Sequence, residues 1–165
     1  MVDIRPLTPE RFADLATLFE EGGDPKWCWC MYWRVRASEM SLSSGPQNRE
    51  RLAGLAAHDP PAGLVAFDDD DRAVGWVSVG PREDYVRLDR SRTRPRVDDV
   101  PVWSIVCFVV ARRARGQGLA ARLLAAAVDH ARARGAPAVE AFPVDTSRGR
   151  PTPATLYAGT LSTFL

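Results

Sequence analysis

A largely apolar run, a turn with two glycines and a helical repeat follow one another between Trp103 and Arg134. Residues 103–111 are rich in β-branched side chains, which is typical of a strand buried on both faces. Residues 119–131 place leucine, alanine and valine at helical spacing, and Gly135 follows as a stop signal. This strand–turn–helix unit constrains the whole chain, because other elements must cover both faces of the strand.

The turn itself has the composition of an anion-binding loop. Arg115, Gly116, Gln117 and Gly118 stand where the helix begins, and the first N–H groups of a helix have no internal partner. The helix dipole makes this end positive, and glycines permit close approach of a phosphate. The Gly-Lys-Ser/Thr ending of a Walker loop is absent, and so are the third glycine and the later acid of a dinucleotide fingerprint.

The string Arg115-x-x-Gly118-x-Ala120 resembles the acyl-coenzyme A signature of the GNAT N-acetyltransferase superfamily, Arg/Gln-x-x-Gly-x-Gly/Ala. Val110, five residues before the arginine, strengthens the resemblance. The resemblance implies an α+β, three-layer GNAT acyl-CoA N-acyltransferase fold, with a mixed sheet splayed at its centre and helices on both faces. It also implies acetyl-CoA as co-substrate and no metal.

The same resemblance assigns the coenzyme contacts. Backbone N–H groups of Phe108 and Val110, with Val109 between them, are expected to meet the pantetheine arm and the thioester carbonyl. The pyrophosphate is expected on the loop made of Arg115, Gly116, Gln117, Gly118, Leu119 and Ala120.

Catalysis in this family usually proceeds by direct attack of the acceptor amine, with a carboxylate as base and a tyrosine as acid. Glu140 is the first candidate for the base and Asp145 the second, although an acid at a strand edge or turn is commonly just solvated. Tyr157 is the candidate acid. Phe164 shares its helical face and competes for the family's tyrosine position, in which case water would protonate the thiolate.

The segment from Trp27 to Trp33 contains three tryptophans, a tyrosine and two cysteines. Side chains of this size are costly to expose, and two interpretations stay open. Either Trp27, Trp29, Tyr32 and Trp33 form a wall of the acceptor pocket, or the segment fills the core beneath a loop. A wall of this kind favours an acceptor with an apolar or aromatic part. Too few other ligands converge on the cysteines for a zinc site.

The other elements follow from periodicity and turn residues. We expect a strand at 2–6, a helix begun by Thr8 and Pro9, a helix over 49–57 capped by Asn48, strands at 63–67 and 73–79 around an exposed Asp68–Asp71 tip, a strand at 138–142 and a helix over 154–165. The segment 81–96 contains six arginines. One or two of them could bind a coenzyme phosphate or an acidic acceptor.

Length, charge and cysteine content set the remaining limits. The 165 residues are expected to form a single GNAT domain, 1–165, with a net charge of +1 that argues against nucleic acid or membrane partners. No signal peptide or spanning run is visible and the cysteine number is odd, so we expect a cytoplasmic protein. GNAT domains usually continue with a Gly-Phe pair and further strands. The late strands are therefore either missing or supplied otherwise, for instance by the partner in a homodimer.

The sequence thus predicts an N-acetyltransferase that moves an acetyl group from acetyl-CoA to a primary amine of a small molecule or peptide. The alternative is a catalytically weak or inactive acyl-CoA-binding regulatory module. The two differ in whether amines trigger release of free thiol.

Overall fold

The computed structural model describes residues 1–149 and 157–165. Five strands form one sheet in the order β1-β2-β3-β4-β5. The first three pairings are antiparallel, whereas β4 and β5 run parallel. The strands are β1 (Asp3–Pro6), β2 (Gly63–Phe67), β3 (Ala73–Pro81), β4 (Val102–Val110) and β5 (Ala138–Ala141). The expected mixed sheet is confirmed.

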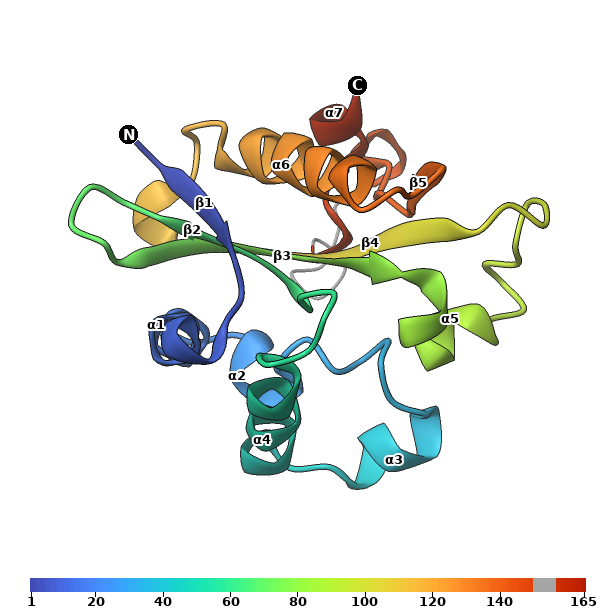
Figure 1. The fold of residues 1–165 in the computed structure, drawn as a ribbon, viewed down its shortest axis with the longest axis horizontal. Coiled ribbons are helices and arrows are strands. Elements are labelled where there is room, and N and C mark those ends of the chain that lie inside the picture. The colour runs from blue at the N-terminus through green and yellow to red at the C-terminus, as the bar shows by residue number, and fades with distance from the viewer. Residues whose placement is uncertain (150–156) are drawn as a thin grey trace.

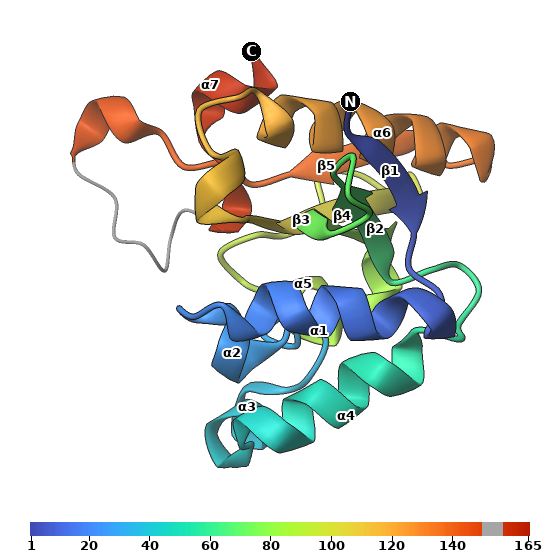
Figure 2. The same cartoon turned by 90° about the vertical axis from the view of Figure 1, so that its left-hand side faces the viewer.

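Helices cover both faces of this sheet (Figures 1 and 2). One face carries α6 (Leu119–Ala133) and α7 (Leu161–Phe164). The other carries α1 (Phe12–Glu20), α2 (Pro25–Cys28), α3 (Ala37–Leu42), α4 (Gly45–Leu55) and α5 (Val86–Asp89). Short 3-10 turns cover Pro9–Arg11, Arg82–Asp84, Arg112–Ala114 and Thr146–Arg148. The three-layer α+β architecture is therefore confirmed.

The core is centred on β3, where the side chains from Ala73 to Gly80 are all buried. Gly75 lets α6 approach this strand closely. A Cβ there would lie 3.0 Å from Leu123 and 3.1 Å from Leu119, which is tighter than ordinary packing. On the opposite face Trp76 packs edge-on against Phe19, with ring centres 6.1 Å apart.

A β-bulge interrupts β4 at Val106. Cys107 faces Ser78 and Ile105 faces Val79, so Val106 has no counterpart on β3. The pairing of β4 with β5 also ends at Ile105. Because a bulge bends and twists its strand, β4 turns away from β5 at this residue, and the sheet is split beyond it.

Two predicted helices differ from the structure. The helix expected over 49–57 begins earlier, at Gly45, because Ser44 and Gln47 form a reciprocal capping box. Asn48 is consequently inside the helix and buried, and its amide donates to the Trp27 carbonyl at 3.0 Å.

The last predicted helix is also shorter than expected. Residues 154–156 lie outside the described residues, and beyond them the described chain forms an α-helix at Leu161–Phe164 and 3-10 structure at residues 157–158. Gly159 has φ +82, a left-handed conformation that interrupts a helix. The chain instead pairs there, since Val144 donates to the Gly159 carbonyl and Leu161 donates to the Val144 carbonyl, both at 2.8 Å.

The aspartates between β2 and β3 form an exposed turn, as expected. Asp68 accepts hydrogen bonds from the backbone N–H groups of Asp70 and Arg72, each at 3.0 Å. Among the described residues, no helix is long and apolar enough to cross a membrane.

Candidate active site

The split exposes part of the β4 backbone. The Ala111 N–H donates to the Val74 carbonyl on β3 at 2.9 Å. Successive residues of an antiparallel strand point their N–H groups to opposite sides. The N–H groups of Phe108 and Val110 therefore point away from β3, toward the side on which β5 no longer pairs with β4. Two backbone donors thus face the opening, with half-buried Val109 between them.

The turn after β4 presents its backbone to open space. Gly116 and Gly118 have φ of +74 and +72, and a Cβ on either would meet nothing within 4 Å. Gly118 is the N-cap of α6, with no side-chain cap and no acidic residue in the first turn. The first N–H groups of α6, at Leu119 and Ala120, are thus left for water or an anion.

The arginines around this turn have different partners. Arg113 donates hydrogen bonds to the Glu21 carboxylate and to the Ala73 carbonyl, which direct it away from the turn. Arg115 is exposed, and its Nε donates to the Val110 carbonyl at 3.2 Å. Gln117 donates to the Arg113 carbonyl at 3.1 Å. The terminal N–H groups of Arg115 donate to none of the residues that the structure describes.

Glu140, the first candidate for the base, lies on β5 within a dense network. Its Oε1 accepts from Arg82 at 2.7 Å and from the Ser104 hydroxyl at 2.7 Å. Its side chain is 18% exposed, whereas that of Arg82 is fully buried. Oε2 makes no hydrogen bond within the described residues. Oε1 of Glu140 is therefore engaged with Arg82 and Ser104, whereas Oε2 has no partner among the described residues.

Arg82 was not singled out by the sequence, although it is the centre of this network. It also donates to Asp89 at 3.2 Å and to the carbonyls of Leu88 and Arg94 at 3.1 and 2.6 Å. Nothing in the local sequence separates Arg82 from the other arginines of the segment 81–96.

Asp145, the second candidate for the base, is exposed and serves its own turn. Its side chain accepts from the backbone N–H and the hydroxyl of Ser147, at 2.9 and 2.6 Å. These bonds hold the pKa of Asp145 below its usual range. A carboxylate that accepts these local hydrogen bonds has the features of a turn residue more than those of a general base.

Tyr157 and Phe164 lie against different parts of the chain. A Cβ at Gly23 would lie 3.3 Å from the Tyr157 hydroxyl, which places this hydroxyl at the α1–α2 connection. Burial, together with nearby Asp24, raises the pKa of Tyr157, so the phenol carries its proton at neutral pH. Phe164 instead packs edge-on against Phe108, with ring centres 6.1 Å apart.

The aromatic segment divides between the core and the surface. Trp29 is 2% exposed and packs against Phe19, with ring centres 5.4 Å apart. Trp27 and Tyr32 are 46% and 41% exposed. Trp33 is half-buried and packs edge-on against Tyr32 at 5.0 Å. The core therefore holds Trp29, while the other three rings are partly exposed.

The cysteines also belong to the packed interior. Cys30 accepts from the Trp76 indole N–H at 3.3 Å. The hydrogen bond to Cys30 and burial raise the pKa of Cys107 well above its ordinary value. Burial likewise raises the pKa of Cys28 to about 12. All three are free thiols, and the described residues contain no metal-binding group of three or more acidic, histidine or cysteine side chains.

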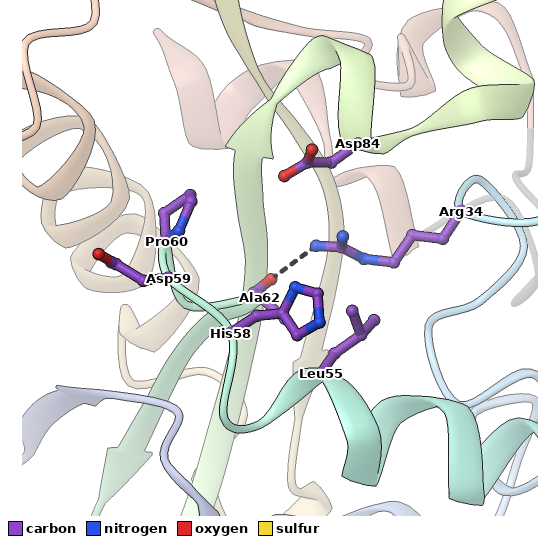
Figure 3. A pocket seen from close by; sticks show the side chains of 7 residues that line it. All are labelled: Arg34, Leu55, His58, Asp59, Pro60, Ala62 and Asp84. Atoms are coloured by element: carbon purple, nitrogen blue, oxygen red, sulfur yellow. Dashed lines mark hydrogen bonds between the residues drawn. The ribbon is translucent and has the colours of Figure 1, made fainter.

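A cavity of about 210 Å³ lies on the helical face that carries α4, away from the glycine turn (Figure 3). Its walls include Arg34, His58 and Asp84. The Arg34 guanidinium reaches across it to the Ala62 carbonyl at 3.1 Å. It also lies 4.5 Å from the Tyr85 ring centre. No local sequence pattern distinguishes Arg34, because its partners come from distant segments.

Comparison with known proteins identifies the arrangement. Residues 18–150 match the Acetyltransferase (GNAT) family. A search of curated proteins found no significant match. Solved structures with a similar fold include the aminoglycoside N-acetyltransferase AAC(6')-Iy in complex with CoA, with TM-score 0.58, 18% identity and coverage of 90% of this chain and 80% of that chain.

Two further solved structures are similar. One is the aminoglycoside 6'-N-acetyltransferase AAC(6')-Ih from Acinetobacter baumannii, with TM-score 0.51, 17% identity and coverage of 86% and 80%. The other is a ribosomal-protein-alanine N-acetyltransferase from Brucella melitensis, with TM-score 0.51, 18% identity and coverage of 84% and 77%. These likenesses concern the fold, whereas the family match covers most of the chain. The chain therefore belongs to the GNAT acetyltransferase family and is an N-acetyltransferase by that membership.

Proposed function

We propose that the protein transfers the acetyl group of acetyl-CoA to a primary amine by direct attack. The observation that carries the proposal is the coincidence of two features on one strand. The outward N–H groups of Phe108 and Val110 follow the bulge at Val106, and the open glycine turn follows the same strand. One extended ligand with a carbonyl at one end and phosphates at the other would meet both.

The residues divide the chemistry among them. The coenzyme supplies the acetyl thioester, and the outward N–H groups of β4 stabilise negative charge that develops on the thioester oxygen. An ammonium has no lone pair, so the acceptor must first lose a proton. Glu140, through Oε2 and a bridging water, is the proposed acceptor of that proton. The amine nitrogen then bonds to the acetyl carbon while the carbon–sulfur bond breaks.

The leaving thiolate needs a proton, and Tyr157 is the proposed donor. Its raised pKa keeps the phenol protonated at neutral pH, as a general acid requires. Trp27, Tyr32 and Trp33 are proposed to line the acceptor side, for a small-molecule or peptide amine. No metal takes part in this scheme.

Coenzyme binding is tested by thermal unfolding with and without acetyl-CoA. A ligand at about 100 times its dissociation constant stabilises the folded state by roughly 2.7 kcal/mol. For a chain of this size that is about 5–10 °C in Tm. The informative variant is Gly118→Trp, which places a large side chain in the open space that the glycine turn faces.

Gly135→Trp is a matched control at the other end of α6. Both glycines have positive φ, +72 and +80, and neither has an atom within 4 Å of an added Cβ. The two variants therefore suffer similar backbone strain. We expect the acetyl-CoA shift to persist in Gly135→Trp and to vanish in Gly118→Trp. Equal shifts in both variants, or none in the parent, contradict coenzyme binding at this turn.

Release of free thiol separates the enzyme from a regulatory acyl-CoA-binding module. Both bind the coenzyme, but only the enzyme releases CoA faster when an amine is added. A parent that binds acetyl-CoA and shows no amine-dependent release over a broad amine panel would favour the regulatory module.

A further inference from the structure

The Arg94 side chain has an unusual environment. It is half-buried, and its guanidinium carbon lies 5.1 Å from the ring centre of Trp33 and 5.6 Å from that of Phe142. Its side-chain N–H groups donate to no group in residues 1–149 or 157–165. A guanidinium stacked on rings keeps its edge free for a planar, two-pronged bond to a carboxylate.

The backbone of Arg94 is fixed in place. Its carbonyl accepts from the buried Arg82 side chain at 2.6 Å, and its N–H donates to the Ser91 hydroxyl at 3.2 Å. These two bonds fix the point from which the Arg94 side chain extends, and the contacts with the two rings limit where its guanidinium lies.

The two rings lie where the sheet opens. Trp33 and Phe142 pack against a small buried cluster that contains Tyr85, Leu88 and Val106, the bulged residue of β4. Phe142 directly follows Ala141, the last β5 residue paired with β4. Trp33 belongs to the connection between α2 and α3, on the face of the sheet opposite α6 (Figure 1). An acceptor that approaches the thioester from this face passes Trp33 and Arg94.

The neighbouring carboxylates are already paired with arginines. Glu140 and Asp89 accept from Arg82, and Glu83 accepts from Arg96 at 2.9 Å. Asp84, the other acid of this segment, lines the separate cavity of Arg34. A polycationic acceptor would thus meet a guanidinium that has no acidic partner among the described residues, whereas an acceptor with a carboxylate could pair with it.

We infer that Arg94 binds a carboxylate of the acceptor, so that the substrate is an amine that also carries a carboxylate. Its apolar or aromatic body would lie against Trp33 and Phe142. The inference rests on the proposed function and names its substrate class. The reaction is unchanged: the amine gains the acetyl group, and CoA leaves as the free thiol with one proton.

The test uses matched amines that differ only in charge. The first pair is 4-(aminomethyl)benzoate and 4-(aminomethyl)benzamide, and the second is 6-aminohexanoate and its amide. The diamine 1,6-diaminohexane represents a cationic acceptor. We expect the parent to prefer each carboxylate over its amide by about tenfold or more in kcat/KM, because charge-assisted hydrogen bonds are stronger than neutral ones.

Arg94→Gln should abolish this preference, because kcat/KM falls for the carboxylates and much less for the amides. Arg92→Gln is the control, because Arg92 is exposed in the same segment. If the parent favours the amides or the diamine, or if Arg94→Gln retains the preference, the inference is wrong while the acetyltransferase proposal stands. If Arg94→Gln instead weakens CoA binding, Arg94 is a coenzyme contact and the inference also falls. If no amine releases thiol, the proposed function itself fails, and the acceptor assignment fails with it.

Discussion

Replacement of Arg82 by methionine should destabilise the protein strongly. The guanidinium is fully buried, and it donates to two carboxylates and two carbonyls. Methionine fills a similar length without donating. Glu140 would keep its bond from Ser104 and Asp89 its bond from Arg96, so neither carboxylate is stranded.

The loss therefore falls mainly on the carbonyls of Leu88 and Arg94. An unsatisfied buried acceptor costs about 1–3 kcal/mol, so the two carbonyls together account for a loss of about 2–6 kcal/mol. We expect Arg82→Met to lower the free energy of unfolding by about 3–5 kcal/mol, which is about 6–20 °C in Tm for a domain of this size. Urea unfolding followed by circular dichroism measures the first quantity and calorimetry the second.

Glu140→Gln is the informative partner variant. Glutamine keeps an acceptor for Arg82 and Ser104 but removes the charge, and Arg82 still pairs with Asp89. We expect a loss of only about 1–2 kcal/mol. If Glu140 is the base, kcat should fall by about 10²–10⁴ at a temperature where the variant is folded. Activity close to the parent's would show that Glu140 serves the network alone.

Arg92→Met controls for the loss of a positive charge, because Arg92 is exposed. An Arg82→Met protein within about 1 kcal/mol of the parent and of this control would refute the reasoning, since an arginine at the centre of the network cannot be removed at so small a cost.

Two further predictions concern tryptophan and histidine side chains. Trp29→Ala should lower the free energy of unfolding by about 3–5 kcal/mol, as large core truncations do. Trp27→Ala should stay within about 0.5 kcal/mol of the parent and should raise KM for the acceptor. Urea unfolding and thiol-release kinetics compare the two variants, and equal losses of stability would contradict the division between core and surface. Burial lowers the pKa of His130 in the folded state, with Arg134 nearby as a second cause. Folding therefore favours the neutral ring, so the parent should lose stability as the pH falls from about 7 through the folded-state pKa of His130. His130→Gln should lose less stability over the same range. If the urea midpoints of the two proteins fall by the same amount as the pH is lowered, the effect is excluded.

The parts predictable from the sequence are those determined locally. The strand, the glycine turn and α6 are consecutive, and periodicity with punctuation is enough to locate them. The hairpin of β2 and β3 is local in the same way. The start of α4 was also readable in principle, because Ser44 and Gln47 form a capping box, but the more conspicuous Asn48 was interpreted as the cap.

The aromatic segment was not predictable ring by ring. Trp29 and Cys30 adopt left-handed conformations, with φ of +47 and +61. Two such residues in succession end any regular periodicity, so spacing along the sequence cannot say which ring turns inward. The role of Glu140 was hidden for a different reason, because its partner Arg82 lies 58 residues away.

The two halves of the site therefore have different physical origins. The proposed coenzyme side depends on backbone N–H groups, which the strand, the bulge and the helix start provide whatever the neighbouring side chains are. The proposed acceptor side depends on side chains from separate segments, and Arg82 connects these segments through its bonds to Glu140 of β5 and to the Arg94 carbonyl. Other chains with the same turn can thus share the coenzyme and differ in the amine. For this reason Arg82→Met should also reduce the preference for carboxylate-bearing amines, because the backbone that presents Arg94 is no longer held.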